Sequence, residues 1–410
     1  MERIEKLLAV MGHPEQGMAY VHIAGTNGKG SVSSFVAETL LQAGYKVGKF
    51  TSPHIFSYQE RFVVNGKTIA AETLINYLKN INKHIVSELD EIYWPTEFEK
   101  LTAAAFAYFF DEKVDIVVLE VGMGGRFDST NVIEPEAAVI TNTELDHLTF
   151  LGNTRSLIAE NKAGIIKRNV PLITGNIHPE AWPVISQRIQ EQNAPLYSIS
   201  DVNILKNSLN SDLSRNLVMQ YQNETIEITS LSLRGGYQIE NAAVAFLTCL
   251  VLKNKGYIIK TEHITTAFSR TYLPGRLEIL QNEPMIIADA AHNGHGAAAL
   301  AKSLNELYPR RQKILICTLL DDKDKFSFLT PLLENTKFVI FTNPNTERSK
   351  HWREWPSIDG FNSNNIEGCE NISEAFAIAL KMLQNDDYML VSGSFYMLAP
   401  IIDWVKHFYK

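Results

Sequence analysis

The sequence predicts an α/β protein with a larger N-terminal domain built on a mostly parallel sheet and a smaller, Rossmann-like C-terminal α/β domain. Short apolar runs alternate with helical patterns along the first half of the chain. These runs show little polar alternation, which is typical of parallel strands that helices cover on both faces. A second α/β pattern starts after LPGR, residues 273–276. We therefore expect one domain over 1–273 and another over 274–410.

Length and charge limit the class of protein. A chain of 410 residues is too long for one ordinary core, which favours two domains. Apolar residues make up 45% and charged residues 20% of the chain, as in a typical globular protein. The net charge of −8 argues against a nucleic-acid binder that depends on overall charge, although a local cluster can still bind small anions. We expect small-molecule partners and no nucleic acid.

Cysteine usage and hydropathy bear on the compartment. Cys249, Cys317 and Cys369 are far apart and form no CxxC pair, so the sequence indicates neither a disulfide framework nor a zinc site. The N-terminal stretch MERIEKLLAV is helical in character and has no signal-peptide pattern. The longest strongly apolar helical stretch, LTAAAFAYFF, is about half as long as a membrane span. We expect a cytoplasmic protein without membrane contact.

The elements of the first half follow from apolar periodicity. Residues 31–43 have one apolar helical face, and Gly44 is the expected stop. Thr96 and Glu99 form a capping box ahead of a second helical pattern over 101–110. Apolar runs predict five strands, at 18–25, 46–51, 115–122, 137–142 and 171–175.

The pattern changes after about residue 200. Residues 203–235 alternate polar and apolar side chains, which is typical of antiparallel strands. A helix is predicted over 241–253, and LPGR reads as a joint between domains. Four further strands are predicted with helices between them, at 284–293, 313–320, 338–344 and 388–394.

The segment GTNGKGS, Gly25 to Ser31, joins a predicted strand to a predicted helix. Unpaired N–H groups and the dipole at a helix N-terminus attract anions, and glycines let the chain wrap closely around phosphate oxygens. Lys29 supplies a cation for the outer phosphates, and a nearby hydroxyl can bind Mg²⁺. The spacing departs from the general P-loop pattern, because Gly30 separates Lys29 from Ser31. The alternative is a turn that only connects strand to helix; we predict a P-loop nucleotide-binding domain.

Polar side chains also follow other predicted strands. Glu120 ends one strand, while Asp146 and His147 come after another. Ligands of α/β sheets lie outside the carboxyl ends of the strands, where a carboxylate can hold Mg²⁺ against phosphate. Each of these residues also has an interpretation without a ligand: Glu120 as a paired acid, and His147 as a surface or capping histidine. Lys162, in the stretch AENKAGI, is another candidate, and its alternative is a solvated lysine on a helix. We expect Ser52, Glu120, His147 and the glycine loop to converge on one crevice.

Nine stretches occur in a familiar order over nearly the whole chain: HIAGTNGKGS, FTSPHIFSYQERF, TEFEKLTAAAF, LEVGMGGRFDSTN, ITNTELDHLTFLG, NKAGIIK, LPGRLE, DAAHN and SGSFYML. Together they resemble the folylpolyglutamate synthase/dihydrofolate synthase family of the Mur ligase superfamily. GGRFDSTN, TSPH and DAAHN separate this family from its peptidoglycan-building relatives. The resemblance implies an enzyme that uses ATP to add L-glutamate to dihydropteroate or a reduced folate through an acyl phosphate.

The resemblance also implies cofactors and site residues. ATP and Mg²⁺ are the implied cofactors, together with CO₂-carboxylated Lys162 and a monovalent cation, and we expect a monomer. The implied catalytic residues are Lys29, Glu120, His147 and Lys162. The implied ATP-binding residues are Gly25, Thr26, Asn27, Gly28, Lys29, Gly30, Ser31, Asn241, Arg276, Asp289 and His292. The implied magnesium ligands are Ser31, Ser52, Glu120, His147 and Lys162. The implied substrate-binding residues are Thr96, Glu97, Phe98, Glu99, Phe127, Asp128, Ser129 and Asp146, with 51–61 as a mobile loop.

Several of these residues have structural alternatives. Arg276 can pin the joint between the domains, and Asp289 and Asn293 can cap the following helix. Thr96 with Glu99 can be a helix cap first, with which a substrate role can coexist. Phe98 and Phe127 can be ordinary core residues.

The chain also departs from the family pattern. Tyr237 stands where histidine is common, and Asn161 precedes Lys162 where an acid is usual. The sequence begins at MERIEKLL, without a segment that helps enclose the cleft in typical members. The resemblance therefore fixes the identity of the acid substrate less firmly than it fixes ATP binding. The competing functions are a Mur-type amide ligase with other substrates, a P-loop kinase or NTPase, and a nucleotide-binding module without catalysis.

Overall fold

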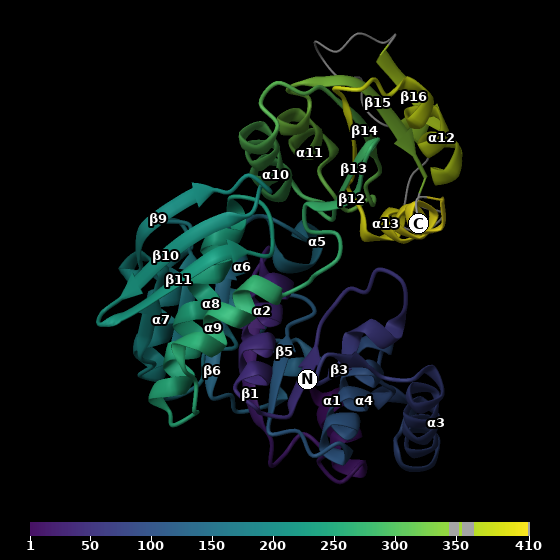
Figure 1. The fold of residues 1–410 in the computed structure, drawn as a ribbon. Coiled ribbons are helices and arrows are strands. Elements are labelled where there is room, and N and C mark those ends of the chain that lie inside the picture. The colour runs from purple at the N-terminus through teal and green to yellow at the C-terminus, as the bar shows by residue number, and fades with distance from the viewer. Residues whose placement is uncertain (344–351, 355–364, 409–410) are drawn as a thin grey trace. The chain divides into compact units, whose positions relative to one another are not determined.

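The computed structural model describes residues 1–343, 352–354 and 365–408. Its contacts divide the chain into two compact units, whose elements are labelled in Figure 1. Unit 1 comprises 1–145, 151–232 and 239–272, and unit 2 comprises 146–150, 233–238 and the described part of 273–410. The predicted α/β class is confirmed. The predicted domain limit after residue 273 stays a prediction, because two short earlier segments group with unit 2.

Unit 1 is built on an eight-stranded sheet in the order β4-β3-β2-β5-β1-β6-β7-β8. All neighbours from β2 to β8 are parallel, and only β3 and β4 add antiparallel pairs at one edge. The five strands predicted in this region are confirmed as β1, β2, β5, β6 and β7. The bounds are β1 (Ala19–Ala24), β2 (Val47–Phe50), β3 (Phe62–Val64), β4 (Lys67–Thr68), β5 (Ile116–Glu120), β6 (Ala137–Asn142), β7 (Leu172–Asn176) and β8 (Leu196–Ser198).

Capping residues set the beginnings of two helices near the sheet. α2 begins at Lys29, ahead of the predicted Ser31, because Gly28 has a left-handed backbone that cannot be part of the helix, and the residues after it are helical. The predicted capping box of α4 is confirmed, since Thr96 N donates to Glu99 Oε2 at 2.7 Å and Glu99 N donates to Thr96 Oγ1 at 3.3 Å. The first nine helices are α1 (Glu2–Val10), α2 (Lys29–Gln42), α3 (Ala71–Glu88), α4 (Glu97–Asp111), α5 (Leu148–Leu151), α6 (Arg155–Ala163), α7 (Trp182–Gln192), α8 (Tyr237–Asn254) and α9 (Thr261–Arg270).

Apolar clusters fill the space between the unit 1 sheet and its helices. One cluster joins the sheet to α1, α3 and α4, and in it the rings of Tyr20 and Phe106 meet edge to face at 5.9 Å. A second cluster joins β6 and β7 to α6 and α7 through residues such as Ile140 and Ile185. Every residue of β5, and all residues of β1 and β6 except Ala19 and Asn142, are buried, so these central strands are covered on both faces, which explains their lack of polar alternation.

A separate antiparallel sheet follows, as predicted for 203–235. Its order is β11-β10-β9, formed by β9 (Asn203–Leu209), β10 (Arg215–Tyr221) and β11 (Glu224–Leu231). α9 packs against β11 (Figure 1).

Unit 2 contains a six-stranded sheet in the order β12-β13-β17-β14-β15-β16. β12 is antiparallel to β13 and the other neighbours are parallel, as expected of a doubly wound domain. The four predicted strands are confirmed as β13, β14, β15 and β17, although Pro344, the end of one run, lies outside the described residues. The bounds are β12 (Glu278–Asn282), β13 (Met285–Asp289), α10 (Gly294–Leu307), β14 (Lys313–Cys317), α11 (Lys325–Leu332), β15 (Thr336–Thr342), β16 (Ile366–Cys369), α12 (Ile372–Met382), β17 (Tyr388–Ser392) and α13 (Phe395–Phe408).

Within the described ranges, we find no helix that combines the length and apolar character needed to cross a membrane.

Removing a buried aromatic ring from the first apolar cluster should destabilise unit 1. Phe106→Ala is expected to lower the free energy of unfolding by about 3–5 kcal/mol, because it leaves a cavity beneath the sheet. Phe110→Ala is the matched control, since Phe110 lies on the same helix and is 54% exposed; we expect a change within about 0.5 kcal/mol. Urea titration followed by circular dichroism measures both, and equal midpoints would contradict the assigned packing.

Candidate active site

The glycine loop, Gly25 to Gly28, is pressed against the carboxyl end of β6. A Cβ atom on Gly25 would overlap the hydroxyl of Thr141, and one on Gly28 would overlap the amide oxygen of Asn241. Gly28 also has a φ of 84°, which side chains other than glycine rarely adopt. Only glycine therefore fits these two positions, and α2 starts directly after the turn.

Asn142, the last residue of β6, holds the loop in place. Its Oδ1 accepts hydrogen bonds from the backbone N–H of Thr26 at 3.1 Å and of Asn27 at 3.0 Å. Its Nδ2 donates to the carbonyl of Asn27 at 3.2 Å, and Thr141 Oγ1 donates to the same carbonyl at 2.6 Å. The sequence analysis missed both residues, although a polar Thr-Asn pair ending a buried strand was a usable signal.

Lys29 folds back over this loop. Its Nζ donates to the carbonyls of Gly25 at 3.0 Å and Thr26 at 3.3 Å, and the side chain is half-buried. Within the part of the chain that the structure describes, Lys29 forms no ion pair. Its charge is held by neutral carbonyl oxygens, so it remains available to an anion at the N-terminus of α2.

Glu120 lies at the carboxyl end of β5, the strand next to β1. The two strands are in register at Ile23 and Glu120, so the carboxylate lies level with the start of the glycine loop. Glu120 is only 4% exposed, and the backbone N–H of Ser52 donates to its Oε2 at 3.3 Å. Lys49 on β2, which the sequence analysis missed, is another neighbour. Burial lowers the pKa of Lys49, while the charges of Glu120 and Glu38 oppose that shift.

Lys162 lies near the end of α6 and is 2% exposed. The turn that follows β5 packs closely on this helix end: Arg126 N donates to the carbonyl of Asn161 at 2.7 Å. A Cβ on Gly125 would come within 2.9 Å of the same carbonyl. The structure therefore brings the turn after Glu120 against the helix that carries Lys162.

Apart from Asp146, the predicted substrate residues lie at the start of α4 and in the segment 122–130 after β5. Phe98 is half-buried and lies so close to Gly122 that a Cβ there would overlap its ring. Thr102 and Ser129 share a hydrogen bond of 2.7 Å between their hydroxyls. Phe127 is 69% exposed, so it is not the core residue of the alternative interpretation.

The remaining predicted residues of α4 serve visible structural roles. Thr96 and Glu99 form the cap described above, and Arg3 Nε lies 3.3 Å from Glu99 Oε2. Glu97 accepts a hydrogen bond of 2.7 Å from the hydroxyl of Tyr58. Tyr58 belongs to the predicted loop 51–61, so this loop is tied to α4 at that point.

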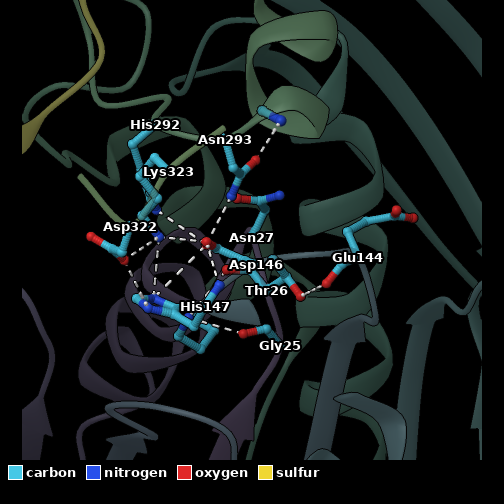
Figure 2. A network of polar contacts seen from close by, with 12 residues as sticks. Gly25, Thr26, Asn27, Glu144, Asp146, His147, His292, Asn293, Asp322 and Lys323 are labelled. Atoms are coloured by element: carbon cyan, nitrogen blue, oxygen red, sulfur yellow. Dashed lines mark hydrogen bonds and ion pairs between the residues drawn. The ribbon is translucent and has the colours of Figure 1, made fainter. Parts of the chain in front are cut away.

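Unit 2 contains a dense polar cluster around Asp146, shown in Figure 2. Lys323 forms an ion pair with this carboxylate, Asn293 Nδ2 donates to its Oδ2 at 3.0 Å, and His292 Nε2 lies 3.5 Å from the same oxygen. Burial by itself would raise the pKa of Asp146, but the hydrogen bond from His292 and the positive charges around it lower that pKa well below its ordinary value.

His147 joins the same cluster in a left-handed backbone conformation, with a φ of 50°. Its Nδ1 lies 3.6 Å from Asp322 Oδ2 and its Nε2 lies 3.5 Å from Lys323 Nζ. Asp322 and Lys323 were not predicted from the sequence, and Asn293 was predicted only as a cap of the following helix. The signal for the first two was the charged run DDKDK directly after a predicted strand.

Asp289, at the end of β13, is a second buried carboxylate of unit 2. It accepts hydrogen bonds from Leu277 N at 2.7 Å, Ala291 N at 2.8 Å and the hydroxyl of Tyr237 at 3.0 Å. Burial raises the pKa of Asp289, while the nearby Arg276 guanidinium and these donors act against that shift. Asp289 thus closes a turn. Of the two predicted caps of the following helix, Asn293 is confirmed, since its Oδ1 accepts from Gly296 N at 2.8 Å.

Comparison with known proteins decides the family. The family model described as Mur ligase middle domain matches residues 23–249, and that described as Mur ligase, glutamate ligase domain matches 275–395. The dihydrofolate synthase/folylpolyglutamate synthase of Bacillus subtilis is 34% identical over 97% of this chain and 93% of its own length.

The chain belongs to the dihydrofolate synthase/folylpolyglutamate synthase family of Mur ligases. Two solved structures are similar over nearly the whole chain. The folylpolyglutamate synthase of Mycobacterium tuberculosis, complexed with ADP and AMPPCP, has a TM-score of 0.90 at 28% identity, covering 98% of this chain and 94% of that one. The E. coli protein FolC, in complex with DHPP and ADP, has a TM-score of 0.88 at 28% identity, covering 100% and 94%. The protein is thus an ATP-dependent ligase.

The two units of this Mur ligase family member each gather part of the predicted site. Unit 1 carries the glycine loop, Ser52, Glu120, Lys162, Asn241 and the substrate residues of α4 and 122–130. Unit 2 carries Asp146, His147, Arg276, Asp289 and His292. In the residues with assigned positions, no three His, Cys, Asp or Glu side chains form a metal-binding group. The convergence of Ser52 and Glu120 with His147 therefore stays a prediction.

The close approach of Gly28 to Asn241 should be needed for ATP binding by this ligase. Gly28→Ala is expected to weaken ATP binding about tenfold or more, because the new methyl group displaces Asn241 and strains the loop. Gly44→Ala is the matched control: Gly44 has a similar φ of 90°, but a Cβ there meets nothing within 4 Å. Isothermal titration calorimetry compares the two variants, and equal affinities would show that the contact with Asn241 is not needed.

Proposed function

We propose that this protein joins the amino group of L-glutamate to the carboxylate of dihydropteroate, to the γ-carboxylate of a reduced folate, or to both, with hydrolysis of ATP to ADP and phosphate. The observation that carries the proposal is the glycine loop with Lys29 at the N-terminus of α2, level with Glu120 on the adjacent strand. The similarity to named folate ligases over the full length of the chain supports the choice of substrates.

The reaction must first bring a carboxylate up to a polyphosphate. A carboxylate oxygen of the acid attacks the γ-phosphorus, the bond to the bridging oxygen breaks, and ADP leaves. The glutamate amine then attacks the carbonyl carbon of the acyl phosphate, loses a proton, and inorganic phosphate leaves as the amide forms. The loop amides and the Lys29 ammonium offset the repulsion between the two anions and stabilise the transferring phosphoryl group.

We propose Mg²⁺ as the second source of positive charge. Ser31, Ser52 and Glu120 offer hydroxyl and carboxylate oxygens, the donors that this ion prefers, and few protein ligands are needed because phosphates and water complete the shell. When bound, Mg²⁺ would withdraw charge from the phosphate oxygens. The residues fit the ion because Glu120 is buried at a strand end beside Ser52.

Carboxylation of Lys162 is part of the same proposal. Its amine would add to CO₂ and lose a proton, so that a buried ammonium becomes an anionic carbamate. The position of Lys162 supports this, because the residue is buried at the helix end that packs against the turn after Glu120, beside the proposed magnesium ligand. A divalent or monovalent cation would balance the charge of the carbamate.

For the acid substrate, we propose that its ring lies along Phe98 and Phe127. Phe98 is half-buried beside Gly122 and Phe127 is largely exposed, so both present aromatic surface next to the turn after Glu120. We also propose a monomer in the cytoplasm, which agrees with three buried cysteines in thiol form.

Substrate omission tests the proposed reaction. ADP release from Mg·ATP should require both L-glutamate and one of the two acids, dihydropteroate or tetrahydrofolate. Release without any amine would identify an NTPase, transfer to a hydroxyl would identify a kinase, and activity only with other acids or amines would identify a different Mur-type ligase. Each of these three outcomes contradicts the proposal.

The proposed acyl-phosphate intermediate leads to a second prediction. With the acid labelled by ¹⁸O in its carboxylate, one labelled oxygen should appear in the released phosphate, because the bridging oxygen leaves with phosphorus. Mass spectrometry of the phosphate measures the transfer. Unlabelled phosphate alongside normal amide formation would exclude this intermediate.

Removal of the Lys29 charge should abolish most turnover. Lys29→Ala is expected to lower kcat/KM on the order of 10²–10³-fold, since a charge aimed at the transferring group is lost. Lys79→Ala, which removes an exposed lysine on α3, is the control and should leave kcat/KM unchanged. Steady-state ADP release gives both values, with circular dichroism as the check on folding; a Lys29→Ala enzyme with normal turnover would disprove the assigned role.

A further inference from the structure

A buried histidine lies beneath the proposed acid-binding segment 122–130. His22 is in the middle of β1, has no exposed surface, and points to the same face of the sheet as Tyr20. Its Nε2 lies 2.9 Å from Thr130 Oγ1, at the end of the segment. The proposed reaction assigns no role to this side chain.

The donor and the acceptor of each hydrogen bond in this contact can be assigned. Thr130 Oγ1 lies 2.6 Å from Asp128 Oδ1, and the hydroxyl donates its single hydrogen to this carboxylate. The same oxygen must therefore accept from His22, which places the ring proton on Nε2. Nδ1 of His22 is buried and has no hydrogen-bond partner in the described residues. Burial, with a contribution from Lys167, lowers the pKa of His22 to about 3, which agrees with a neutral ring.

Asp128 uses these contacts to shape the segment. Its Oδ1 also accepts from Thr130 N at 3.0 Å, and its Oδ2 accepts from Met123 N at 2.9 Å. The carboxylate thus joins the two ends of the segment around Gly122, the residue that packs against Phe98. Asp128 acts here as a brace for the backbone, and His22 reaches that brace through Thr130.

Stability alone does not account for a histidine at this position. A buried nitrogen without a partner costs about 1–3 kcal/mol, and an apolar side chain of similar size would avoid that cost. What the histidine provides in return is the single N–H bond to Thr130. We therefore look for the role of His22 in the conformation of the segment that it contacts.

We propose that His22 is a positioning residue for the acid substrate: through Thr130 and Asp128 it holds segment 122–130 in the conformation that receives the acid. In taking the segment as the acid site, this inference rests on the proposed function. It assigns no chemical step to His22, which lies within β1 and before the glycine loop.

Steady-state kinetics with selected variants tests the inference. His22→Leu and Thr130→Val should each raise KM for the acid about tenfold, with KM for ATP and kcat changed less than twofold. Because both act on one chain of bonds, the double variant should show no further increase. His22→Gln, whose amide can donate to Thr130, should restore KM to within twofold. Thr174→Val is the control, since Thr174 is equally buried in β7 and its hydroxyl lacks a partner within the described structure.

Hydrogen exchange gives a readout that needs no turnover. In the absence of substrates, peptide amides of 122–131 should exchange faster in His22→Leu than in the wild type, and His22→Gln should reverse this. Equal increases in KM for ATP and acid, or failure of the glutamine to rescue, would overturn the inference. If the wild type used neither acid, the proposed function would fail, and unchanged exchange in His22→Leu would separately reject the positioning role.

Discussion

The candidate active site depends on the side-chain amide of Asn142. This one group accepts from two consecutive backbone N–H groups of the glycine loop and donates to a carbonyl of the same loop. It can do so because β1 and β6 are parallel neighbours, paired at Ala24 and Ile140, so that their carboxyl ends lie at one edge of the sheet. With the loop fixed there, Gly28 starts α2, and Lys29 emerges on the first turn close enough to return to Gly25.

The charges around the loop explain how an acidic protein can handle two anionic substrates. The chain has a net charge of −8, so its overall field repels them. The loop itself offers oriented dipoles, and Lys29 adds one full charge that no carboxylate of the described structure neutralises. Glu120 on the adjacent strand acts in the opposite direction. A bound cation that Glu120 attracts would convert this negative group into part of a positive site, which is the role we propose for magnesium.

The positions of the strands along the chain and the start of α4 were predictable, because they depend on local sequence. Buried apolar runs predicted the parallel strands, and Thr96 with Glu99 predicted the start of α4. The partners of the site residues were not predictable in the same way. Lys323 meets Asp146 across 177 positions of sequence, and His22 meets Thr130 across 108. Such pairs follow from how strands are ordered in a sheet, which periodicity does not reveal. The resemblance supplied residues by position, yet it could not show that Asp128 would brace the backbone of its own segment.

Two glycine-rich segments of this chain illustrate why composition alone does not identify a phosphate site. Gly25 and Gly28 permit close approach to Thr141 and Asn241, while Gly122 and Gly125 permit close approach to Phe98 and the end of α6. The steric reason is the same in both segments, and each follows a buried parallel strand.

They differ in what comes next. GTNGKGS leads directly into the N-terminus of a fourteen-residue helix with a lysine at its first position, so the dipole and the charge act on the same space. The segment GMGG is followed by Arg126, which forms an ion pair with Glu160, and then by a short 3-10 turn at Ser129–Val132 braced by Asp128. The first arrangement suits an anion and the second suits a shaped apolar surface, so the helix and the lysine, rather than the glycines, distinguish the proposed ATP site.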